Sequence, residues 1–237
     1  MKVSIVGVHN LKQTIHVSSI DTNRNNEINN FELKFDESLT HLASFLKEQG
    51  HEVSLIANFS SAPMSIMALN ELESNGVSVY PDLQNEITYD LTLKTDKDTY
   101  IFKDQTKLSL SNFQIEKIKQ SEYLITNLDS YDILADFHNY KVDKVIVINT
   151  IPMFRALNFV EGIVLDSTPE NKEETITSLM QSGLSWIAIF NGEHVEFHTL
   201  KHSYKLNFDS YHVFLDQFLK ALEAKALITW LEANQIT

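Results

Sequence analysis

The strongest constraint on the fold is a repeated alternation of short apolar runs with amphipathic helical stretches. Short apolar runs between turns are typical of buried strands, and apolar residues three and four apart are typical of helices. The expected strands are 3–7, 53–57, 123–126, 144–148, 162–165, 186–190 and 195–199. The expected helices are 36–50, 61–75, 112–119, 131–138, 169–181, 211–224 and 226–234. This alternation indicates an α/β fold whose mainly parallel sheet is covered on both faces.

Two regions depart from the alternation, and we expect them to form a separate small sheet. Their short strands have polar connections, and several alternate apolar and polar residues, as strands with one wet face do. The expected lid strands are 14–19, 30–35, 77–79, 87–93 and 99–102. The chain is therefore expected to be a single domain, 1–237, with lid strands from about 14–35 and 77–102.

Charge and cysteine content exclude several classes of function. The formal charge of −13 argues against nucleic acid as a partner, because such a surface needs a basic footprint. The same charge disfavours an anionic membrane, and no apolar run reaches the ~18 residues of a spanning helix. The absence of cysteine excludes disulfides, thiol catalysis and zinc thiolates. Residues 2–7 read directly as a strand with no signal-peptide pattern, so we expect a cytoplasmic protein.

Nine histidines raise the question of a metal site. His194, His198 and His202 are spaced four apart, which on a helix would place them on one face, as in zinc sites. Residues 193–199, however, alternate as a strand does, and this places Glu196 between two histidines on one solvated face. We therefore expect no metal site.

Several segments resemble, in order and spacing, the ribokinase or PfkB carbohydrate kinase family. They are 5–12 (the family's first strand), 50–57, 146–152 (a strand ending in Asn-Pro), 186–192 (a strand ending in Thr-x-Gly) and 209–222 (Gly-Ala-Gly-Asp and the catalytic helix). The resemblance spans roughly residues 2–224. It implies a ribokinase-like three-layer α/β/α sandwich with a small β-sheet lid. The family usually continues with residues that complete an adenine pocket, whereas only 226–237 follow here, so the chain resembles a divergent, C-terminally shortened member.

The resemblance implies four substrate-binding positions. Asn10 is the family's own residue. Lys12 stands where the family has a sugar-binding Asp, and a lysine donates hydrogen bonds where a carboxylate accepts them. His41 stands where the family has an Asn, and Thr88 lies where the family often has a Thr in its lid strands.

Three further positions resemble the phosphate and nucleotide side of the family site. They are Asn149, in the Asn-Pro strand end, Glu170, in the motif tied to magnesium, and Gly192, after a strand whose phosphate-binding Thr is Phe190 here. Structural explanations also exist, since strand-end asparagines cap turns, and a Glu after Pro169 suits the first turn of a helix.

The catalytic position itself is altered. His212 stands where the family has its catalytic Asp, and Asp209 and Tyr211 replace glycines. An imidazole can act as a general base, but the family reaction depends on an anion hole of glycine amides at a helix N-terminus. Asp209 lies three residues earlier and could take the role after a local shift. His212 and Asp209 are therefore the catalytic candidates, although the surrounding residues favour an ordinary helix-start role for His212.

Two functions follow from these substitutions. The first is a divergent sugar or nucleoside kinase homologue with impaired catalysis, a pseudokinase that keeps the fold to bind a small-molecule ligand or a partner. The second is an active ATP-dependent kinase with rearranged catalytic groups, which would use ATP and Mg²⁺. Phe31, Leu33 and Phe35 lie on one face of the expected lid. Lids of this family often clasp each other, so the resemblance also implies a homodimer, and a purely structural lid-mediated dimer is a third reading.

Overall fold

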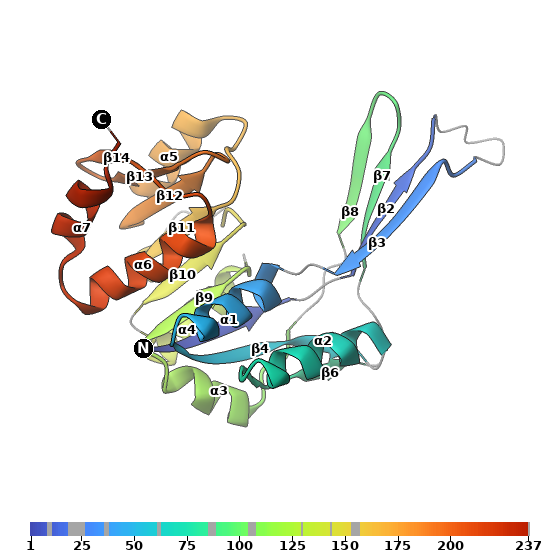
Figure 1. Cartoon of the computed structure of the whole chain (residues 1–237), viewed down its shortest axis with the longest axis horizontal. Helices are drawn as coiled ribbons and strands as arrows, with labels where there is room; N and C mark the ends of the chain where they lie inside the picture. Colours follow the sequence, from blue (N-terminus) through green and yellow to red (C-terminus); the bar gives the residue numbers. More distant parts are fainter. Residues whose placement is uncertain are drawn as a thin grey trace.

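The computed structural model describes residues 1–8, 11–18, 27–35, 38–60, 63–84, 89–103, 108–128, 130–142, 144–152 and 157–236. It confirms the α/β class, with one large sheet between helices and a second, smaller sheet (Figure 1). The helices are α1 (Ser38–Glu48), α2 (Pro63–Ser74), α3 (Asn112–Lys119), α4 (Tyr131–Asn139), α5 (Lys172–Gln181), α6 (Tyr211–Glu223) and α7 (Leu227–Asn234). Among the described residues, no helix is long and apolar enough to cross a membrane.

Within the described residues, the main sheet has ten strands in the order β14-β13-β12-β11-β10-β9-β1-β4-β5, and β6 also pairs with β4. The strands are β1 (Lys2–Gly7), β4 (Glu52–Ser60), β5 (Ser78–Val79), β6 (Asp82–Gln84), β9 (Tyr123–Thr126), β10 (Val145–Ile148), β11 (Gly162–Leu165), β12 (Trp186–Phe190), β13 (Val195–Thr199) and β14 (Ser203–Leu206). All are parallel to their neighbours except β13 and β14, which pair antiparallel at one edge. The carboxyl ends of β1, β4, β9, β10, β11 and β12 therefore lie at one edge of the sheet.

Helices cover both faces of this sheet, which gives the expected three layers. One apolar cluster joins residues of α1, α2, α6 and α7 to the sheet, and Phe214 and Phe218 of α6 lie at its centre with no exposed surface. The other cluster joins α3, α4 and α5 to the opposite face. Side chains alternate between the two faces along each strand, so β1 contributes Ile5 to the first cluster and Val6 to the second.

The lid is a four-stranded sheet in the order β3-β2-β7-β8, and Figure 1 shows it to one side of the main sheet. Its strands are β2 (Leu11–His16), β3 (Asn30–Phe35), β7 (Tyr89–Lys94) and β8 (Thr99–Lys103). One expected lid strand was wrong, because residues 78–79 of β5 pair with β4 in the main sheet. These two residues follow the crossover through α2, and their parallel pairing with β4 satisfies their backbone hydrogen-bonding groups.

A buried hydrogen-bonded pair of ionisable side chains helps to hold α6 against the start of β4. His51 Nε2 lies 2.7 Å from Asp216 Oδ1, and both side chains are buried. Lys220 Nζ donates to the other carboxylate oxygen of Asp216 at 2.9 Å, one turn further along the same helix. Buried ionisable groups are costly unless they are paired, so these contacts specify how α6 sits on the sheet.

Candidate functional site

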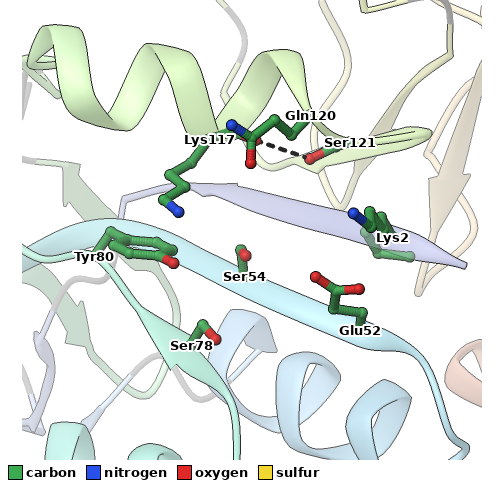
Figure 2. Close-up of a pocket in the computed structure, with 9 residues that line it drawn as sticks. Lys2, Glu52, Ser54, Ser78, Tyr80, Lys117, Gln120 and Ser121 are labelled. Atoms are coloured by element: carbon green, nitrogen blue, oxygen red, sulfur yellow. Dashed lines mark hydrogen bonds between the residues drawn. The ribbon is translucent and has the colours of Figure 1, made fainter.

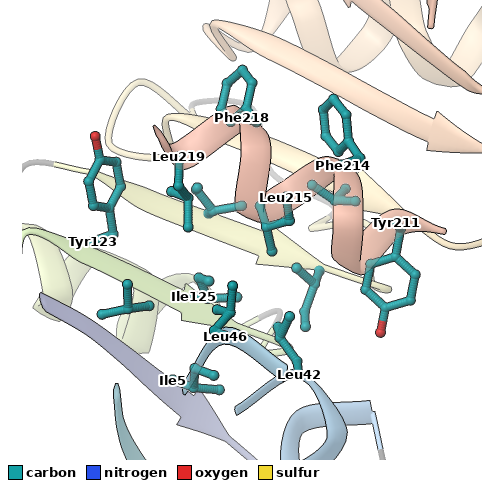
Figure 3. Packing of buried hydrophobic residues seen from close by; sticks show 14 of the residues in the cluster. Ile5, Leu42, Leu46, Tyr123, Ile125, Tyr211, Phe214, Leu215, Phe218 and Leu219 are labelled. Atoms are coloured by element: carbon teal, nitrogen blue, oxygen red, sulfur yellow. The ribbon is translucent and has the colours of Figure 1, made fainter. Parts of the chain in front are cut away.

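The first turn of α6 carries the catalytic candidates, and its position follows from burial of the helix. Phe214, Leu215, Phe218 and Leu219 are buried against the sheet and α1. Figure 3 shows Leu219 near Tyr123, the first residue of β9, and Tyr211 near the strand arrowheads. The helix therefore begins at the carboxyl edge of the parallel strands, which is where ligands bind in sheets of this kind.

Ser210 caps this helix. Its backbone is extended, with φ −157° and ψ 145°, and its Oγ accepts a hydrogen bond from the amide of His212 at 3.2 Å. A serine at this position satisfies one of the amides that a helix start leaves unpaired. That amide is therefore already engaged within the protein.

The structure brings together His212, a catalytic candidate, and His41, a substrate-binding candidate. The ring of His41, on α1, meets the ring of His212 edge-on, with centroids 4.9 Å apart. Phe45 lies 5.9 Å from the same imidazole, and the Tyr211 ring lies 3.9 Å from it. Nε2 of His212 is buried without a hydrogen-bond partner among the described residues. The imidazole thus belongs to an aromatic contact between α1 and α6.

Burial, together with the neighbouring His41 imidazole, lowers the pKa of His212 from its usual 6.5 to about 4. Burial disfavours the charged form of a histidine, and a second imidazole adds to that effect. His212 is therefore neutral at pH 7. It offers no positive charge to a phosphate and is a weaker base than an ordinary histidine.

The other candidates that the structure describes are carried by separate elements. Asp209 is exposed, directly before the helix cap, and Glu170 is exposed in the turn that precedes α5. The expected helix start at Pro169 was early, since α5 begins at Lys172, so Glu170 lies outside the first helical turn. Asn10 and Thr88 lie outside the described residues. Lys12 is on β2, where it pairs with Lys34 of β3.

Asn149 and Gly192 shape turns at the ends of two strands. Asn149 has a positive φ of 54°, and its Oδ1 accepts from the amide of Asp166 at 3.1 Å, which ties the end of β10 to the end of β11. Gly192, with φ +93°, lies in the hairpin between β12 and β13. A Cβ at Gly192 would meet nothing within 4 Å, so its backbone conformation, rather than a close neighbour, requires glycine.

Asn127 is a residue that the sequence analysis missed. Its Oδ1 accepts from the amide of Val8 at 3.1 Å, and its Nδ2 donates to the carbonyl of Val8 at 3.0 Å. A Cβ on Gly7 would lie 2.1 Å from that Oδ1, so the contact needs a glycine at the end of β1. Asn127 thus fixes the backbone that leaves β1 towards the lid. The signal in the sequence that could have identified Asn127 is its position directly after an apolar strand.

His194, directly before β13, and His198, within it, are partly covered, so the solvated face expected for them was wrong. Glu196 pairs with Lys172 at the start of α5 and lies between His194 and His198, whose Nε2 atoms are 3.7 and 3.6 Å from its carboxylate. His194 is only 8% exposed. Among the described residues, no group of three or more histidine and carboxylate side chains could hold a metal ion.

Comparisons with solved structures decide the fold. A carbohydrate kinase from Agrobacterium tumefaciens superposes with a TM-score of 0.65 and 13% identity, over 95% of this chain and 87% of that one. Ribokinase from Thermotoga maritima gives 0.65 at 11% identity, over 93% and 85%. Ribokinase from Arabidopsis thaliana, solved with ribose and ATP, gives 0.64 at 10% identity, over 93% and 85%. The chain has the ribokinase fold.

Sequence comparison alone does not reach this result. No protein-family profile matches the chain, and no curated protein matches it. At identities of 8–13%, these structures show only the fold of this chain, and its chemistry has to be argued from its own residues. Those residues place His41 and His212 in contact, and they place Asn149, Glu170 and Gly192 after strands that end at the same edge.

We predict that His212 makes the protein sensitive to mild acid. Because its pKa is about 4 in the folded protein and near 6.5 in the unfolded chain, the unfolded state binds more protons between these values, and stability falls as the pH drops through this window. Urea unfolding at several pH values should show a smaller loss in His212→Asn than in the wild type.

The control for this measurement is His202→Asn, which removes an exposed histidine in the turn between β13 and β14. It should lose stability with falling pH as the wild type does. An unchanged pH dependence in His212→Asn would contradict a buried, neutral His212.

Proposed function

We propose that this chain is a divergent homologue of the PfkB-type sugar and nucleoside kinases, impaired in phosphoryl transfer, that keeps the fold to bind a small-molecule ligand or a protein partner. The observation that carries the proposal is the closed start of α6. There, Ser210 takes up the amide of His212, and the His212 imidazole packs on Tyr211 and His41.

The physical reason is that a transferring phosphate needs free amides and positive charge where its own charge develops. Backbone cradles for phosphate rely on glycine, and no glycine follows Gly192 in the sequence. Tyr211 is 8% exposed, so its ring occupies interior volume at the helix start. His212 is neutral at pH 7 because its pKa is about 4. Each change removes a different contribution to phosphoryl transfer.

The edge next to α6 still suits recognition of a polar ligand. His41 is exposed and can exchange hydrogen bonds with hydroxyl groups through its imidazole. A solved relative of the same fold holds ribose and ATP. The ligand class that we propose is therefore a sugar or nucleoside, bound without transfer of phosphate.

The alternative is an active ATP-dependent kinase that uses Mg²⁺ and rearranged catalytic groups. Asp209 supports it best, because it is exposed, carries a carboxylate and directly precedes the start of α6. Glu170 would then help to place the Mg²⁺ ion. His212 would act as a base only in its neutral, weakly basic form.

An assay of ADP release with ATP, Mg²⁺ and a panel of sugars and nucleosides separates the two functions. We expect a rate on the order of a thousandfold below that of an active ribokinase, because loss of anion-hole donors costs about that much. The rate should not change in Asp209→Asn or Glu170→Gln. Sugar-dependent turnover that Asp209→Asn abolishes would establish the active kinase instead.

We also propose that two copies of the chain associate through the lid. Four apolar residues form one row across its strands, because Ile15 pairs with both Phe31 and Leu93, and Leu93 pairs with Tyr100. Phe31 and Tyr100, on the two outer strands, are 48% and 43% exposed. An apolar row across an exposed sheet favours burial against another surface.

Sedimentation of the wild type and of Phe31→Glu tests this association. The substitution should raise the dimer dissociation constant at least about tenfold, because it places a charge in an apolar interface. Leu200→Glu is the matched control, since Leu200 is 73% exposed in the turn beyond β13. A wild-type monomer, or equal effects of the two variants, would contradict the proposal.

A further inference from the structure

A row of serine hydroxyls crosses the main sheet at its β5 edge, on the face that carries α3. Ser4 of β1 is in register with Ser54 of β4, and Ser54 is in register with Ser78 of β5. Two positions further along the same strands, this face has Val6 and Ile56, which belong to the apolar cluster. Ser4 is fully buried, Ser54 is half-buried and Ser78 is exposed, so the row runs from the core to the surface of this edge.

Ser54 and Ser78 of this row line a small polar cavity, of about 60 Å³, between the sheet and α3. Figure 2 shows the side chains of Lys117, Tyr80, Ser54 and Glu52 around a common space. Ser121 extends the row, since its hydroxyl lies 2.5 Å from that of Ser4. The cavity also has Lys2, Val3, Ser78 and Gln120 in its wall.

Lys117 is held in place at this cavity. Its Nζ lies 5.4 Å from the ring centre of Tyr80 and 5.3 Å from that of Phe113, within reach of a cation–π contact with each. Gln114, one turn earlier on α3, donates from Nε2 to the carbonyl of Tyr80 at 3.1 Å. These contacts fix α3 to the strand edge and hold an ammonium group beside the serine row.

The charge of the cavity differs from that of the whole protein. Lys2 and Lys117 line it against a single carboxylate, Glu52, whereas the chain has a formal charge of −13. Lys2 and Glu52 begin β1 and β4, so the cavity lies towards the amino ends of these strands. It is therefore on the opposite edge from the start of α6 and independent of the function proposed for that edge.

We propose that this cavity binds a hydrogen phosphate group. Its volume fits a group of about that size, the two ammonium groups attract an anion, and the serine and tyrosine hydroxyls donate to its oxygens. The Glu52 carboxylate selects among anions, because it can only accept a hydrogen bond. A protonated phosphate donates one from its P–OH, whereas sulfate has no such proton at neutral pH and would face an unpaired negative charge.

Calorimetric titration of the whole protein with inorganic phosphate at neutral pH tests the site. Lys117→Met keeps the length of the side chain and removes the charge, so it should weaken binding about tenfold. Lys119→Met is the matched control on the same helix, because Lys119 pairs with Glu116 away from the cavity, with Nζ 2.7 Å from Oε1. No binding by the wild type, or equal loss in both variants, would overturn the proposal.

Glu52→Gln provides a second readout that does not depend on the strength of binding. The wild type should bind phosphate in preference to sulfate, and the variant should lose this preference because its amide can donate to either anion. Equal affinities of the wild type for both anions would overturn the role of Glu52 and the proposal with it. Titration with glycerol phosphate at mildly acidic pH, where this monoester also carries a P–OH, then separates the two sources of the group, since tighter binding identifies a phosphate monoester and weaker binding identifies the free ion.

Discussion

The packing of α6 against the main sheet is the interaction on which the rest of the structure depends. Its apolar face buries Phe214, Leu215, Phe218 and Leu219 completely, beside Trp186 and Phe197 of the sheet. Full burial of side chains of this size contributes about 1.5–3 kcal/mol each. The His51–Asp216 pair adds a directional contact that apolar packing lacks. Together they fix both the position and the rotation of the helix.

That rotation decides what stands at the carboxyl edge of the sheet. The helix has to begin near Tyr211, because the buried residues that follow it recur at helical spacing. The resemblance to the family implies an anion-binding turn at such a helix start. Here the first turn holds a capping serine, a buried tyrosine and a neutral histidine. The packing of the fold and the chemistry of this edge are therefore separable.

The sequence predicted most elements of the main sheet because short apolar runs between turns indicate buried strands. The expected bounds of 123–126, 162–165, 186–190 and 195–199 match β9, β11, β12 and β13. β14 was missed, since its four residues alternate only weakly, and the C-terminal segment that pairs with it at Gln235 is distant in sequence. The lid range was too wide because a two-residue strand has no periodicity to distinguish one sheet from another.

The site was less predictable, since it depends on contacts between elements. The resemblance made His41 a substrate-binding candidate and His212 a catalytic candidate, but their ring contact follows from how α1 packs on α6. The clamp of Asn127 on Val8 joins residues more than a hundred positions apart. The serine row needs the register of three strands, which spacing within any one strand cannot supply. The local sequence pattern thus determines the helices and strands, whereas tertiary packing determines which of their side chains meet.

The central claim is that the start of α6 is closed to phosphate. Titration of the ¹⁵N-labelled protein with ATP and Mg²⁺, observed at the backbone amides of residues 210–214, tests it most directly. The account predicts that these amide resonances stay in place up to millimolar nucleotide, because the cap and the two rings already occupy the helix start. Saturable shifts at the amides of His212 and its neighbours would show an open anion site and contradict the account.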